Sequence, residues 1–126
     1  MKYNMVYNPD PSRLVKSLPI RLTTIRVLEY FEGNRLVELS GPNGELYLKT
    51  WADLQANPYG ERWLIFKSHP LRMFLEGKQN LRSLIVNSPG FIYLVDEVSI
   101  YIILPSEMPE EYLPTENSYF DPELMP

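Results

Sequence analysis

Alternation of apolar and polar residues runs through much of the chain between residues 25 and 104. Successive side chains of a β-strand point to opposite faces, so a period of two predicts strands. The alternation is clearest in the first half, where Gly33-Asn34 and Asn43-Gly44 supply two tight hairpin turns. The pattern therefore predicts an antiparallel meander of three strands, over residues 25–31, 35–40 and 45–51.

The pattern changes in the second half of the chain. Residues 61–67 are apolar on both faces, which predicts a fourth strand that is central or covered by a helix. Apolar residues then recur at i, i+3 and i+4, which predicts two short helices. The first lies between Pro70 and Gly77. The second begins after the cap residue Asn80 and ends at Val86. Two further strands are predicted over residues 91–95 and 98–104.

Strands grouped before and after a helical pair are typical of an α+β fold rather than of alternating β-α-β units. We therefore expect an antiparallel sheet of five or six strands, made of the N-terminal meander and a C-terminal hairpin. The two short helices lie between strands four and five. A small curled barrel is the alternative arrangement of the same strands. One more short helix is predicted near the N-terminus, capped by Asp10 or Ser12 and ending at Leu18.

A chain of 126 residues fits a single domain, and its composition divides it into three parts. Residues 1–19 form an N-terminal extension or short helix, and residues 20–104 form the globular body. Residues 105–126 form a proline-rich tail with six acidic residues and no basic one, whereas the rest carries twelve bases and ten acids. Several tail residues are apolar, so we expect the tail to pack partly on the body.

Residue types that carry common catalytic chemistry are scarce. The chain has no cysteine, which excludes disulfides, thiolate catalysis and cysteine-based metal sites. His69 is the only histidine, and its place before Pro70 suits a helix cap better than a catalytic base. No nucleotide-binding, nucleophile-elbow or calcium-binding motif occurs in the sequence. We therefore expect no metal and no cofactor, and the inventory leans against an enzyme without excluding one.

The hydropathy and charge of the chain also bear on its partners. No apolar run reaches the length of a signal peptide or of a membrane-spanning helix. We therefore expect a cytoplasmic protein without a membrane partner. The near-neutral body lacks the basic stripe that is typical of nucleic-acid binding, which disfavours that partner too.

Paired carboxylates could serve as an acid and a base. Glu29 and Glu38 lie on adjacent predicted strands, and Asp96 and Glu97 lie on a predicted turn. Half-exposed antiparallel sheets normally carry charges on their solvated face, which favours a structural role for these residues. A small-ligand site or a weak carboxylate-based hydrolase stays open as an alternative function.

Aromatic and basic residues mix along the predicted strands, and such a sheet face can bind a partner. It can also stack single-stranded nucleic acid, although an ordinary core with a polar margin explains the same residues. In the tail, an acidic segment with tyrosine and leucine could dock on a partner. The candidate binding residues are Arg35, Tyr47, Trp51, Arg62, Trp63, Glu110, Glu111 and Tyr112.

Several motifs together resemble a known family. They are Tyr30-Phe31-Glu32-Gly33, the run from Arg62 to Ser68, residues 71–78, Leu81-Arg82-Ser83, and residues 108–114. They resemble a family of small bacterial, often cyanobacterial, domains of unknown function, over residues 22–116. Position 34 is Asn where that pattern has Pro. The resemblance implies that residues 109–114 belong to the domain, and it carries over no catalytic residue.

The combined pattern favours a non-enzymatic interaction or regulatory module that binds another protein. Single-stranded nucleic-acid binding and a small-ligand or hydrolase function are the alternatives. Self-association as a homodimer also stays open. Residues 98–104 are apolar at nearly every position, so this strand would pair with a second copy if it lay at a sheet edge.

Overall fold

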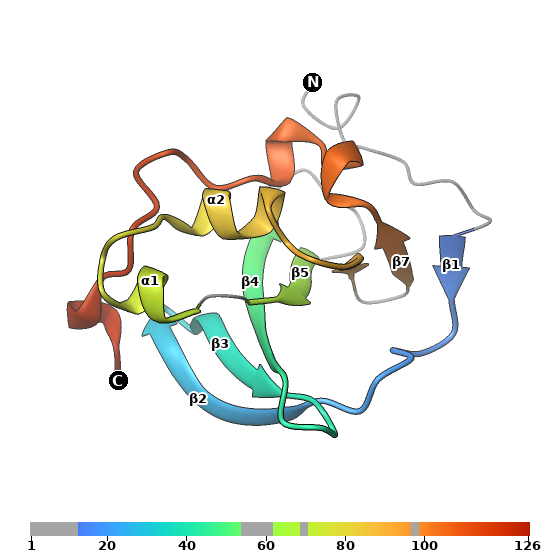
Figure 1. Cartoon of the computed structure of the whole chain (residues 1–126), viewed down its shortest axis with the longest axis horizontal. Helices are drawn as coiled ribbons and strands as arrows, with labels where there is room; N and C mark the ends of the chain where they lie inside the picture. Colours follow the sequence, from blue (N-terminus) through green and yellow to red (C-terminus); the bar gives the residue numbers. More distant parts are fainter. Residues whose placement is uncertain (1–12, 54–61, 69–70, 97–98) are drawn as a thin grey trace.

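The computed structural model describes residues 13–53, 62–68, 71–96 and 99–126. These residues form an antiparallel sheet of seven strands, two α-helices and three 3-10 helices (Figure 1). The strands are β1 (Leu14–Val15), β2 (Thr23–Tyr30), β3 (Asn34–Ser40), β4 (Leu46–Asp53), β5 (Arg62–Lys67), β6 (Ile92–Val95) and β7 (Ile100–Ile103). The helices are α1 (Leu71–Leu75), α2 (Leu81–Val86), η3 (Pro105–Glu107), η4 (Glu110–Tyr112) and η5 (Pro122–Leu124). The strand order in the sheet is β1-β7-β6-β5-β4-β3-β2.

The meander β2–β3–β4 depends on two turns with left-handed backbone. Between β2 and β3, Glu32 has a φ of 54° and Gly33 a φ of 128°, and between β3 and β4 Gly44 has a φ of 82°. Glycine adopts such angles without the steric penalty of a side chain, which is why it marks both turns. The two hairpins lie where the glycine and asparagine pairs of the sequence predict them.

Alternate residues of the strands build two separate cores, one on each face of the sheet. The first face contains Leu48 and Phe66, which lie opposite each other on β4 and β5. The second face contains Ile65 and Tyr93, which lie opposite each other on β5 and β6. Because β5 contributes to both cores, it is apolar on both sides, as its sequence predicts.

Helices α1 and α2 and the tail contribute to the core of the first face (Figure 1). Phe74 of α1 and Tyr112 of η4 are both buried there. The ring of Phe120 lies against Phe74 with the centroids 5.5 Å apart. The backbone N–H of Leu81 donates to the carbonyl oxygen of Ser118 over 2.8 Å. The tail and the helices therefore pack together on this face.

The link between β1 and β2 covers part of the second face. These two strands are the opposite edges of the sheet, so the link passes from one edge to the other (Figure 1). Its apolar residues Leu18, Ile20 and Leu22 pack against the core that contains Tyr47 and Tyr93. Among the described residues, the segment that packs on the second core from outside the sheet is this extended link, and no helix contributes to that core.

The α+β class and the antiparallel sheet are confirmed, but the predicted strand count is wrong. The described residues contain seven strands instead of five or six, because β1 adds an edge strand before the meander. For the same reason the two helices lie between the fifth and sixth strands, not between the fourth and fifth. The sheet is open, since β1 and β2 do not pair with each other, so the described strands do not close a barrel.

The predicted helix ending at Leu18 is wrong where the structure describes it. The segment forms β1 instead, which pairs with Ile100 and Tyr101 of β7. Pairing with a distant strand overrides the local capping signals at this position. Residues 1–12, which include the two predicted caps, lie outside the described residues. The same pairing places β7 between β1 and β6, inside the sheet. The argument for a homodimer required this strand to lie at an edge, so it no longer applies.

Candidate binding surface

Two tryptophans lie side by side on the second face. Trp51 of β4 and Trp63 of β5 are opposite each other in the register. The Cζ atom of Arg35 lies 3.5 Å from the ring centroid of Trp51, and the Nζ atom of Lys49 lies 4.7 Å from that of Trp63. Both distances are within the roughly 6 Å range of cation–π attraction. We call these four residues the tryptophan strip.

Arg35 is held in place by the turn between β2 and β3. Its Nε donates to the carbonyl oxygen of Phe31 (2.6 Å), and its Nη2 donates to that of Glu32 (3.3 Å). The left-handed backbone at Glu32 and Gly33 allows the chain to reverse beside Arg35. The turn therefore fixes the guanidinium over Trp51, and a pre-organised side chain loses less entropy when a partner binds.

The strip carries positive charge that no described carboxylate pairs with. Neither Arg35 nor Lys49 forms an ion pair within the described ranges. All four side chains are half-buried, so the stems cover apolar surface while the charged groups stay within reach of solvent. The indole N–H of Trp51 is buried and has no hydrogen-bond partner among the described residues. Arg62 Nε on the first face and Ser68 Oγ are also buried without a partner among the described residues, so this feature is not specific to the strip.

Three of the other candidate residues are buried in the two cores. Tyr47 belongs to the core of the second face, and burial, with a smaller effect of the Glu45 charge, raises the pKa of its hydroxyl. Arg62 is 4% exposed and lies on the first face, where its Nη1 donates to the hydroxyl oxygen of Tyr112. The guanidinium also lies 5.4 Å from the ring centroid of Tyr112. Arg62 and Tyr112 therefore join the tail to the sheet and lie on the opposite face from Trp63.

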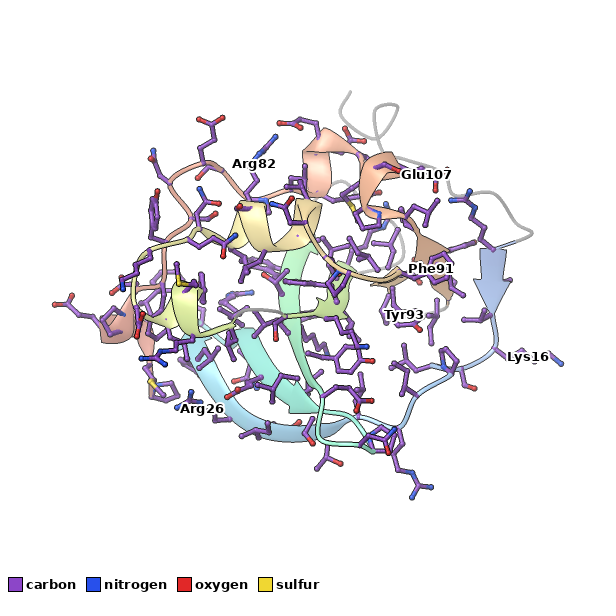
Figure 2. All side chains as sticks on the ribbon, viewed as in Figure 1. Lys16, Arg26, Arg82, Phe91, Tyr93 and Glu107 are labelled. Carbon is purple, nitrogen blue, oxygen red and sulfur yellow. The ribbon has the colours of Figure 1, made fainter. Side chains whose placement is uncertain are left out.

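The acidic candidates of the tail lie apart from the strip. Glu110 accepts a hydrogen bond from Nη2 of Arg82 over 2.5 Å, and Glu111 is exposed. The Nη1 atom of Arg82 donates to the carbonyl oxygen of Pro114 over 3.0 Å. Figure 2 shows Arg82 pointing from α2 toward the tail. The eight candidate residues therefore do not form one surface. The structure brings together Arg35, Trp51 and Trp63, and it adds Lys49 to them. Lys49 is two residues from Trp51 on β4, so the alternation of the strand could have placed it on the same face.

The candidate carboxylates do not converge on a site. Glu38 is buried and forms an ion pair with Arg26, with 2.7 Å between Oε1 and Nε. Glu29 lies opposite Leu36 and accepts a hydrogen bond from the backbone N–H of Asp121 over 3.2 Å. Burial raises the pKa of Glu29 above its ordinary value of 4.5, and the Asp121 charge adds to this, while the hydrogen bond opposes it.

The remaining candidates for catalysis or metal binding are Asp96, Glu97 and His69. Asp96 accepts hydrogen bonds from the backbone N–H (2.8 Å) and the hydroxyl (2.9 Å) of Ser99. His69 and Glu97 lie outside the described residues. No group of three or more histidines and carboxylates that could hold a metal ion occurs in the part of the chain that the structure describes.

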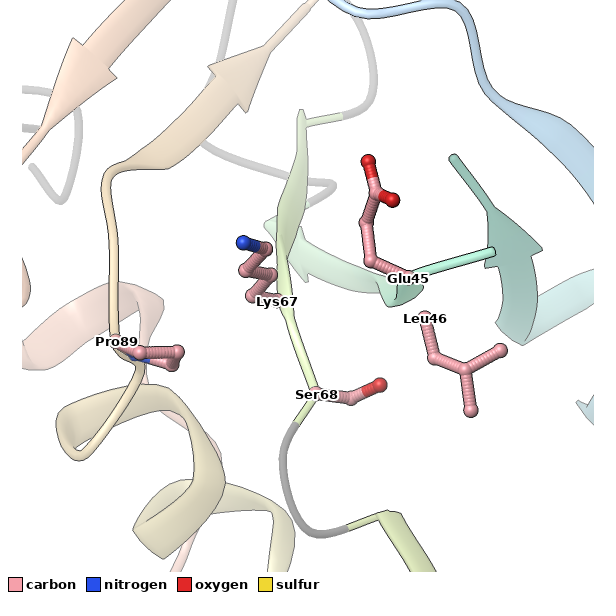
Figure 3. A pocket seen from close by; sticks show the side chains of 5 residues that line it. All are labelled: Glu45, Leu46, Lys67, Ser68 and Pro89. Atoms are coloured by element: carbon pink, nitrogen blue, oxygen red, sulfur yellow. The ribbon is translucent and has the colours of Figure 1, made fainter. Parts of the chain in front are cut away.

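A cavity of about 310 Å³ lies beside the sheet where β4 begins and β5 ends (Figure 3). It is lined by Glu45, Leu46, Lys67, Ser68 and Pro89. Sequence reasoning missed this cavity, because Pro89 comes from the segment that precedes β6 and only the fold brings it beside β5. The parity that Lys67 shares with Trp63 was the available sign that its side chain lies on the second face.

Comparison with protein-family models, with curated proteins and with solved structures finds no match to the chain. The resemblance to small bacterial domains therefore stays a prediction. None of the helices among the described residues is long and apolar enough to span a membrane.

Proposed function

We propose that this protein is a non-enzymatic interaction module that binds an acidic segment of another protein through the tryptophan strip. The observation that carries the proposal is the pair of neighbouring tryptophans, each with a cation over its ring and neither cation paired with a described carboxylate. Tryptophan and arginine are the residues most enriched among interface hot spots. A chain without cysteine suits the reducing cytoplasm in which we place this function.

The stacking in the strip favours a protein partner over single-stranded nucleic acid. Sequence-tolerant binding of single strands depends on bases stacking on open aromatic faces. In the strip, a face of each indole is already occupied by Arg35 or Lys49, so a base stacking there would have to displace a cation. The net charge of −4 also repels phosphates over a longer range. Carboxylates of a partner protein can instead meet the two cations where they stand.

The distribution of the carboxylates supports a binding function over hydrolysis. Glu29, Glu38 and Asp96 each interact with a different neighbour and lie on different strands or turns. An acid–base pair would need two carboxyl groups beside one substrate. The four residues of the strip, in contrast, are already neighbours in the structure.

The two tryptophans of the chain are both in the strip, so tryptophan fluorescence reports on this surface alone. The test is a titration with a glutamate-rich peptide that contains no tryptophan, at low and at high salt. We expect a saturable change in emission that weakens as salt screens the charges. Oligothymidine serves as the nucleic-acid probe. A larger response to oligothymidine than to the peptide would favour the nucleic-acid alternative and contradict the proposal.

Matched variants connect the response to the strip. Lys49→Gln and Arg35→Gln each remove one of the two cations that would meet the partner's carboxylates. An exposed ion pair contributes up to about 1 kcal/mol, so each variant should bind up to roughly fivefold more weakly. Lys78→Gln is the control, because Lys78 is exposed beyond α1 and pairs with Glu76. Equal binding by the strip variants and the control, or no response of the unmodified protein at low salt, would refute the proposal.

A further inference from the structure

The acidic tail carries more negative charge than its own contacts neutralise. Residues 105–126 contain six acidic residues and no basic one. Two of the acidic residues pair with bases of the body: Glu107 with Arg13, and Glu110 with Arg82. The other four are exposed and form no ion pair within the described ranges: Glu111, Glu116, Asp121 and Glu123. The tail therefore offers carboxylates to a basic surface.

The tryptophan strip has the complementary charge but lies on the other side of the sheet. Its cations, Arg35 and Lys49, have no partner carboxylate among the residues that the structure describes. Lys49 lies opposite Ile65 on the second face, whereas Phe120 of the tail packs on the first face. The sheet therefore separates the tail from the strip of the same molecule. The strip of another molecule has no such barrier.

Exposed aromatic residues accompany the charges on both surfaces. Phe31 is 59% exposed, and its carbonyl oxygen accepts the hydrogen bond from Nε of Arg35, so it adjoins the strip. In the tail, Tyr119 is 50% exposed. Tyr119 and Glu116 line the same open hollow beside α2, so one partner surface could contact both. Aromatic residues are enriched at interfaces, and complementary charges add specificity to such a contact.

We propose that the acidic segment bound by the tryptophan strip is the tail of a second copy of this chain. The tail carboxylates meet Arg35 and Lys49, and the exposed aromatic residues pack at the margin of the contact. This inference rests on the proposed function, because it names the partner of the same strip. The second copy supplies the anionic half of a site whose cationic half is in the first copy. Two different patches meet, so this is a heterologous contact.

The test is sedimentation velocity of the full chain at increasing protein concentration. We expect weak association at low salt, with a dissociation constant on the order of 100 µM, as is typical of small and charged contacts. The average mass should rise above that of one chain. The rise should shrink at high salt, because the screening length falls from about 10 Å at 0.1 M to about 3 Å at 1 M. A mass that stays that of one chain up to about 1 mM at low salt, tenfold above the expected constant, would overturn the inference.

Two variants separate the halves of the contact. The strip variant combines Arg35→Gln with Lys49→Gln, and the tail variant combines Glu111→Gln, Glu116→Gln and Glu123→Gln. Each variant lacks two or more ion pairs, so its association should be roughly tenfold weaker. Each also keeps the half that the other lacks, so an equimolar mixture should associate more strongly than either variant alone. A mixture that associates no better than its components would contradict a contact between strip and tail.

A control variant tests whether charge alone explains the loss. Lys16→Gln combined with Lys78→Gln removes two positive charges, as the strip variant does, at exposed positions outside the strip (Figure 2 labels Lys16). This variant should associate like the unmodified protein. A loss equal to that of the strip variant would overturn the inference.

The glutamate-rich peptide distinguishes this inference from the proposed function. The peptide should compete with the tail for the strip and return the associated protein to single chains. If the strip binds the peptide but the unmodified protein does not associate, the partner is not a second copy, and the proposed function stands. If the protein neither binds the peptide nor associates, both are refuted.

Discussion

The two faces of the sheet are built from the same strands and differ in how they are covered. On the first face, two helices and the tail contribute to the core, and the buried Glu38 and Arg62 each have a neighbouring side chain as partner. On the second face, one extended link packs over part of the sheet and leaves Trp51 and Trp63 half-buried beneath cations. Alternation along a strand thus lets one segment contribute to a core on the first face and to the proposed binding strip on the second.

The strongest way to break this comparison is to remove a large side chain from the first face. Phe66 is fully buried, so Phe66→Ala should lower the free energy of unfolding by about 3–5 kcal/mol. Domains of this kind have a total free energy of unfolding of about 5–15 kcal/mol, so the variant should lose a large share of it. Lys67→Ala, one residue along and on the second face, should change it by less than about 0.5 kcal/mol. Urea unfolding measures both values, and equal losses would show that the faces do not differ in this way.

A more selective change tests how the tail is held on the first face. Tyr112→Phe keeps the ring but removes the hydroxyl that accepts from Arg62. A buried donor left without its partner costs about 1–3 kcal/mol, and we expect a loss of that size in the free energy of unfolding. Tyr119→Phe is the matched control, because Tyr119 is 50% exposed in the same tail, and it should change little. If both variants had the same stability, the contact between Arg62 and Tyr112 would not hold the tail.

The smallest expected effect is that of a charged residue at the margin of the first face. It is measured as the pH dependence of the free energy of unfolding. The pKa of Glu29 is raised mainly by burial, so its ionised form destabilises the folded state at neutral pH. Glu29→Gln should therefore be more stable than the unmodified protein at pH 7. The difference should shrink as the pH falls through the raised pKa, and vanish below the ordinary value of 4.5.

Glu76 provides a control of opposite sign for this pH dependence. Hydrogen bonds from Arg72 and then Lys78 lower the pKa of Glu76, so its ionised form stabilises the folded state. Glu76→Gln should be slightly less stable at pH 7, and the difference should disappear as the pH falls through the lowered pKa. Thermal unfolding between pH 3 and pH 8 records both curves, and a shared sign would contradict the environments assigned to the two residues.

Alternation along the strands allowed part of the candidate binding surface to be predicted from the sequence. Trp51 and Trp63 lie on neighbouring strands that alternate regularly, so their common face follows from the period of two. Arg62 is next to Trp63 in the sequence and therefore lies on the other face, which a grouping by residue type overlooks. The place of Tyr112 was not predictable, because its contact with Arg62 joins residues fifty positions apart.

The N-terminal strand shows the same limit for the fold. Local signals around residue 14 predicted a helix, whereas the structure contains the two-residue strand β1. So short a strand has little alternation of its own, and only its pairing with Ile100 and Tyr101 defines it. The cavity had the same difficulty, since Pro89 reaches it from a separate segment. Features made by distant partners leave weak marks on the local sequence.

The pairing of β1 with β7 has a consequence for the order of events during synthesis. Leu14 is synthesised long before its partner Tyr101, because the strands between them come first. Contacts between residues that are distant in the sequence form slowly, and this one cannot form before both strands have been synthesised. The link that carries Leu18, Ile20 and Leu22 is anchored at one end only until β7 arrives. On the growing chain, the link can therefore cover the second face only after β7 has been made. Until then, the residues that the meander contributes to this face stay open to chaperones.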